Sequence, residues 1–142
     1  MKKLNNKGFS MVELIIVIAI MAILVGAIAP TLIKYIKKSR RSADLNNGQT
    51  IAAAFQEAAA NPDAADVLPS TGSSTYTVNN LVAGTDNFCT EFKSILGTTP
   101  KSKLISGDFS ITYVPANNSV EVWVSSTANQ VYPTPAGAYA SN

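Results

Sequence analysis

The sequence predicts an α+β protein in which the C-terminal half of one long N-terminal helix packs on a small antiparallel β-sheet. Residues 9–29 form an apolar run in which Glu13 is the only side chain that ionises. Apolar residues at helical spacing continue this run to about residue 60. Two later segments, 108–114 and 120–125, alternate apolar and polar residues, which is typical of strands with one buried face.

The apolar run is long enough to cross a membrane. Its 21 residues, Phe9 to Ala29, would form a helix about 31 Å long, close to the thickness of a bilayer hydrocarbon core. A carboxylate in such a segment is costly unless it is paired, so we expect Glu13 to have a partner. If the chain were cut between Gly8 and Phe9, the new amine would lie one helical turn from Glu13. That amine, in the same chain or in an axially offset copy, is the expected partner.

The helical pattern extends well beyond the apolar run, as an amphipathic continuation over residues 30–61. Pro30 lacks an amide hydrogen and clashes with the carbonyl four residues earlier, which makes this position a weak point of the helix. Asn46-Asn47-Gly48 is a predicted weak patch, and Asn61-Pro62 ends the helix. A helix from Phe9 to Ala60 would be about 78 Å long. A 142-residue globule cannot enclose it, so a membrane or other copies must bury its N-terminal half.

The remainder, residues 62–142, predicts a small globular head. Asp86 is the expected N-cap of a short helix that ends at Gly97. The other expected segments are a loop at 62–74, the beginning of a helical turn at 80–82, strands at 108–114 and 120–125, and an irregular tail at 129–142.

The N-terminal residues resemble those of a type IV prepilin, most specifically over Lys7 to Pro30. The resemblance implies that residues 1–8 are a leader peptide, and that a prepilin peptidase cuts after Gly8. Phe9 would then be the mature N-terminus, commonly N-methylated by the same enzyme. Glu13, at the fifth mature position, would neutralise the amine of an adjacent subunit. The helix would bend or melt near Pro30 on assembly.

The resemblance also implies partners and a location. The subunit would be a single-pass protein of the cytoplasmic membrane, with residues 9–29 as the membrane-spanning and later filament-core helix. It would form a helical homo-oligomer with the help of an inner-membrane assembly platform and its ATPase complex. The product would be an extracellular type IV pilus that supports adhesion, aggregation or motility. The alternative is a pseudopilin of a type II secretion or DNA-uptake system.

Other interpretations of the apolar run fit less well. A secretory signal cleaved after Ala27-Ile28-Ala29 would have an unusually long apolar region, would contain Glu13 and would leave Pro30 first. A plain membrane anchor explains the length of the run but not Gly8-Phe9 followed by Glu13. A lipoprotein is poorer still, because the only cysteine, Cys89, lies far downstream.

The charges on the two flanks conflict with the orientation that the resemblance implies. Three lysines precede the apolar run, and five basic residues follow between Lys34 and Arg41. The positive-inside rule would therefore place the C-terminal side in the cytoplasm. We expect the opposite, with the leader inside, because the first flank also carries the α-amino charge. Residues 34–41 would then lie at the headgroup level, where anionic lipid attracts cations.

The composition does not favour catalysis. The chain has no histidine, which excludes imidazole acid–base chemistry and histidine-bearing metal sites. We expect no enzyme activity, no cofactor and no metal, and we expect Cys89 to fill the core beside Phe88 and Phe92. No acid follows Glu121, which argues against the C-terminal calcium site of many secretion pseudopilins.

A third functional class, a secreted carbohydrate-binding module, rests only on four aromatic residues. These are Tyr113, Trp123, Tyr132 and Tyr139. Aromatics in strands are more commonly core residues or cross-strand pairs, although a filament with such residues on its surface would also present an adhesive face.

Overall fold

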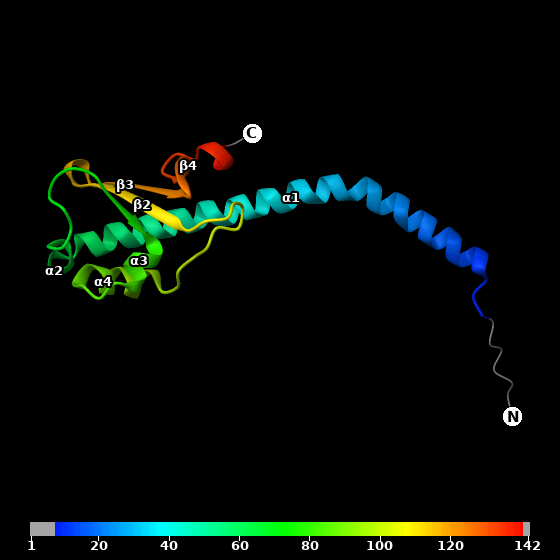
Figure 1. Ribbon diagram of the computed structural model, residues 1–142, viewed down its shortest axis with the longest axis horizontal. Coiled ribbons are helices and arrows are strands. Elements are labelled where there is room, and N and C mark those ends of the chain that lie inside the picture. The colour runs from blue at the N-terminus through cyan, green and yellow to red at the C-terminus, as the bar shows by residue number, and fades with distance from the viewer. Residues whose placement is uncertain (1–7, 141–142) are drawn as a thin grey trace, which may run out of the picture. The chain divides into compact units, whose positions relative to one another are not determined.

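The computed structural model describes residues 8–140 (Figure 1). The chain divides into two compact units that adjoin in sequence at Lys38 and Ser39. One helix, α1 (Met11–Ala60), contributes to both. The helix and a four-stranded antiparallel sheet confirm the predicted α+β architecture.

The first unit consists of the exposed residues 8–10 and the N-terminal part of α1. The helix begins at Met11, two residues later than expected, because Ser10 lies outside it and caps its first turn. It continues through Pro30 without interruption. The predicted bend or break at Pro30 refers to the assembled state, so it stays a prediction.

The second unit contains the C-terminal part of α1 and all the strands. The strand order is β1-β2-β3-β4, with each neighbouring pair antiparallel. Two short 3₁₀ turns lie at Pro115–Asn117 and Gly137–Tyr139. The remaining elements are α2 (Pro62–Ala65), β1 (Ser74–Thr77), α3 (Val78–Ala83), α4 (Asn87–Leu96), β2 (Phe109–Val114), β3 (Ser119–Val124) and β4 (Ser126–Tyr132).

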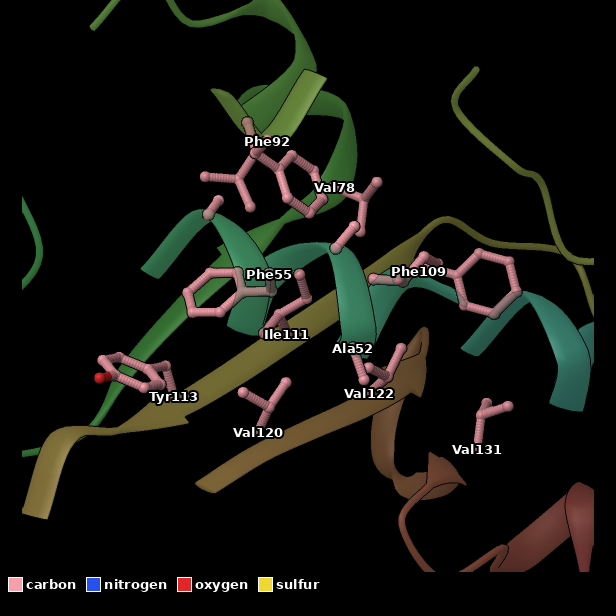
Figure 2. Packing of buried hydrophobic residues seen from close by; sticks show 14 of the residues in the cluster. Ala52, Phe55, Val78, Phe92, Phe109, Ile111, Tyr113, Val120, Val122 and Val131 are labelled. Carbon is pink, nitrogen blue, oxygen red and sulfur yellow. The ribbon is translucent and has the colours of Figure 1, made fainter. Parts of the chain in front are cut away.

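One face of the sheet packs against α1 to form the core (Figure 2). Phe55 of α1 lies at its centre, with ring centroids 4.9 Å from Phe88 and 5.2 Å from Tyr113. On β2 and β3, inward positions alternate with outward ones, so Ile111 and Val122 lie opposite each other on the core face. The head therefore has its own core.

The predicted helix at 86–96 is confirmed by α4. The Asp86 carboxylate accepts a hydrogen bond from the Cys89 amide at 2.7 Å, as an N-cap does. Gly97 ends the helix with a φ of 73°, and glycine adopts a positive φ without strain from a side chain. The two predicted strands are also present, as β2 and β3.

The predictions for the loop and the tail were partly wrong. Residues 62–74 contain α2, and β1 begins at Ser74. The tail is not wholly irregular, because β4 extends from Ser126 to Tyr132. Its pairing with β3 is shifted between Val122 and Val124, so the alternation of apolar and polar residues is lost and the strand has no period-two signal.

The prediction of a weak patch at 46–48 was also wrong, because α1 continues through it. Gly48 is buried, and a Cβ atom there would lie 2.7 Å from Cγ1 of Val131. The glycine therefore permits a close approach of helix and strand rather than loosening the helix.

We predict that Gly48→Ala destabilises the head by about 1–3 kcal/mol, although alanine is the better helix former. The added methyl group would displace Val131. Urea unfolding of the full chain in detergent measures the effect. The control is Asn46→Ala, an exposed position on the same helix, which we expect to stabilise the helix slightly. A Gly48→Ala variant as stable as this control would contradict the packing role of Gly48.

Candidate processing and assembly site

The first turn of α1 is a capping box. The Val12 amide donates to Oγ of Ser10 at 3.3 Å, and the Ser10 amide donates to Oε2 of Glu13 at 2.8 Å. These two bonds satisfy amides that a helix start leaves without partners. The box therefore fixes where α1 begins and holds the Glu13 carboxylate beside the preceding backbone.

Gly8 and Phe9 precede this turn as exposed chain without secondary structure. No side chain or backbone atom outside its neighbours lies within 4 Å of where a Cβ on Gly8 would be. Phe9 is 89% exposed. The peptide bond between them is therefore open to a protease, and the amine that cleavage would release lies next to the amide that Glu13 already accepts from.

The structure thus brings together three of the four residues singled out from the sequence: Gly8, Phe9 and Glu13. Pro30 lies about five turns further along α1 and belongs to a different part of the helix. No large apolar side chain between these points is buried. An 18-residue window of α1 has a mean hydropathy of 2.9, so the helix is long and apolar enough to cross a membrane.

A second polar centre, in the head, was missed by the sequence analysis. Asp44 of α1 is completely buried. Its carboxylate accepts hydrogen bonds from the amides of Lys103 and Leu104, at 2.8 and 2.9 Å, and from the Ser102 hydroxyl at 2.7 Å. It also accepts one from the Tyr139 hydroxyl at 3.0 Å. One carboxylate therefore ties α1 to the loop after α4 and to the C-terminal segment.

The C-terminal segment is held to α1 by a second bond from the same helix. Nη2 of Arg41 donates to the Tyr139 carbonyl at 2.6 Å. Burial raises the pKa of the Tyr139 phenol to about 12, so the hydroxyl keeps its proton and remains a donor. The sequence held a signal for this centre, because Asp44, Gly48, Ile51 and Phe55 lie on one face of a helix. Because Ile51 and Phe55 are apolar, this face is expected to point into the core, and an acidic residue on it is expected to be buried.

The only cysteine fills the core, as expected. Cys89 is buried beside Phe88 and Phe92. Burial, and then the neighbouring Asp86 carboxylate, raise the pKa of its thiol to about 11. Within residues 8–140, no group of three or more histidine, cysteine, aspartate or glutamate side chains is placed to hold a metal ion. The described residues thus hold neither an activated nucleophile at Cys89 nor such a metal-binding group.

Comparison with known proteins agrees with the geometry of the N-terminal segment. Residues 3–29 match the family described as the prokaryotic N-terminal methylation motif. This is the class III signal peptide motif of type IV pilins, and it indicates a precursor like that of a pilin or pseudopilin. The motif implies processing by a prepilin peptidase and assembly into a pilus-like filament. No curated protein and no solved structure matches the chain.

We predict that Asp44→Asn destabilises the head by about 2–4 kcal/mol, because an amide replaces one acceptor oxygen with a donor that faces other donors. Tyr139→Phe, which removes one hydroxyl from the same centre, should cost only about 1 kcal/mol. Trypsin cleavage at Lys101 and Lys103, which flank the bonded loop, should accelerate in the first variant and much less in the second. Equal cleavage rates in Asp44→Asn and the parent chain would show that the Asp44 carboxylate does not hold this loop against α1.

We predict that the Cys89 thiol alkylates about 100-fold more slowly in the folded chain than in denaturant at about pH 8, since a pKa of about 11 in place of 9.0 lowers the thiolate fraction by that factor. The folded-state pKa is raised, so this thiol's contribution to stability is complete below pH 9.0 and is lost as the pH rises towards 11. The Cys89→Ser variant has no thiol, so its stability should not show this part of the decrease as the pH rises. Alkylation at the denatured rate would show that the thiol is not buried.

Proposed function

We propose that this chain, which carries the N-terminal motif of a pilin-like precursor, is the structural subunit of an extracellular type IV pilus. One observation supports the proposal most strongly. The methylation motif leads directly into an apolar helix whose large side chains are all exposed up to Ile36, while the head has a core of its own. Such a helix needs a lipid or protein environment, and a filament of identical copies supplies the second.

The proposed division of the chain follows from this. Residues 1–8 are the leader, which prepilin peptidase removes after Gly8. Phe9 becomes the mature N-terminus and is methylated. Residues 9–29 span the cytoplasmic membrane and later form the filament core, while residues 30–61 continue the helix into the head, residues 62–142. An inner-membrane assembly platform and its ATPase complex act on the membrane-bound subunit.

Glu13 would guide assembly through its charge. In the single chain its carboxylate accepts from the Ser10 amide, a neutral donor. In an apolar surrounding this leaves most of the charge uncompensated, which is costly. The ammonium group on Phe9 of an adjacent subunit would neutralise it. Pairing thus favours a specific axial offset between copies, and Pro30 marks where the helix yields as it packs.

The pseudopilin alternative shares the leader and the helix, so the motif does not separate the two functions. The acids of the chain end at Glu121, which leaves no carboxylate in the C-terminal segment for a calcium site. This supports the pilus over a calcium-binding secretion pseudopilin.

We expect Gly8→Leu to block cleavage. The chain leaves open space beside Gly8, in which a protease can fit closely, and the branched leucine side chain would fill that space. Immunoblotting of membranes should then show only the longer precursor. Gly26→Ala, which changes another open glycine inside the apolar helix, should be processed as the parent chain is. Normal cleavage of Gly8→Leu would refute the assigned leader junction.

We expect Glu13→Ala to be cleaved normally but to lower the yield of sheared filaments by about tenfold or more, since a loss of about 1.4 kcal/mol changes an equilibrium constant tenfold. The matched control is Glu57→Ala, an exposed glutamate in the part of the same helix that belongs to the second unit. Filament yield equal to that of the control would remove the pairing role of Glu13.

A further inference from the structure

The sheet has a second face, opposite the core, which no helix of the described chain packs against. Figure 1 shows α1 along one side of the strands, and the core residues of β2 and β3 point towards it (Figure 2). Residues of the other parity point away. The register places Trp123 on this outer face, surrounded by Thr75, Thr77, Ser110, Thr112, Glu121 and Gln130.

The indole of Trp123 lies over the sheet rather than standing away from it. Its Nε1 donates to Oγ1 of Thr112 on β2 at 3.0 Å. The Thr112 hydroxyl is in turn 3.4 Å from that of Thr75 on β1. Ser110, directly opposite Trp123, is only 8% exposed although it points away from the core. Its cross-strand neighbours on this face, Trp123 and Thr77, therefore shield Ser110, and Trp123 remains partly exposed itself.

We propose that this outer face is a binding site for neutral polysaccharide. The C–H bonds on the face of a sugar ring carry partial positive charge, which matches the negative π-face of an indole. The surrounding hydroxyl and amide groups are donors and acceptors suited to sugar hydroxyls. Glu121 is the only charged member of the face, so phosphate-bearing and acidic ligands would be repelled.

The architecture favours this role in two further ways. A β-sheet holds the side chains in place before the ligand arrives, so little entropy is lost on binding. For its display on a filament this inference rests on the proposed function, in which copies pack through their exposed apolar helices. Within the second unit, no helix of the described residues covers the face directed away from α1, so it is open to the medium unless a second copy covers it. Of the other aromatics considered from the sequence, Tyr113 and Tyr139 are core residues and Tyr132 packs against the core, so they take no part.

The test uses Trp123 as its own probe, because it is the only tryptophan of the chain. The full mature chain in detergent is titrated with cellohexaose, mannohexaose and chitohexaose while tryptophan emission is recorded. We expect a saturable shift of emission with at least one of them. Thr75→Val should weaken that binding about fivefold, the effect of one lost hydrogen bond. Thr90→Val, an exposed threonine on α4, should leave it unchanged.

Sheared filaments are then co-sedimented with the corresponding insoluble glucan, mannan or chitin. Binding that Trp123→Phe reduces in filaments of normal yield would support the proposal. The absence of an emission shift with all three sugars, or binding that Thr75→Val leaves unchanged, would overturn it. Binding by the detergent-solubilised chain but not by filaments would show that a second copy covers the face, which refutes its display. Because the titration needs no filament, it decides the site even if the chain forms no pilus.

Discussion

The apolar part of α1 must be removed from water, and the head does not bury it. Every large apolar side chain from Phe9 to Ile36 is exposed in the single chain, whereas the head closes its own core around Phe55. Because burial of apolar surface is the dominant favourable term in folding and association, this helix demands a membrane or other copies. The exposed peptide bond after Gly8 and the charge at Glu13 fit that setting, in which the proposed cleavage and pairing would take place.

The head in turn must be stable without help from the N-terminal part of α1, which belongs to the first unit. The chain has a single cysteine, so no internal disulfide ties down its C-terminal segment. The Asp44 carboxylate does this instead, through hydrogen bonds to the loop after α4 and to the Tyr139 hydroxyl. Nearby, Gly48 lets α1 approach β4 closely enough for Val131 to be buried. The hydrogen bonds to Asp44 and the close packing at Gly48 thus hold the last segment of the chain against α1.

Strong local signals were predictable from the sequence. Period-two alternation located β2 and β3, and the capping residues Asp86 and Gly97 located α4. The predictions that failed concern residues whose contacts are with residues distant in sequence. The pairing of β4 with β3 is irregular, so its residues show no alternation. Gly48 resembled a weak position until β4 was placed against it. Asp44 was missed, although it shares a helix face with Ile51 and Phe55. At the N-terminus, the sequence singled out Gly8, Phe9 and Glu13 because their chemistry is local.

The central claim is that this chain is cut at one place and then polymerises through the exposed helix. The most direct measurement is the N-terminal sequence and intact mass of the protein in a fraction sheared from the cell surface. The account predicts a chain that begins at Phe9, is heavier by one methyl group than the unmodified residues 9–142, and is abundant in that fraction. A chain that begins at Pro30, or one that keeps Met1 and stays in the membrane, would contradict it.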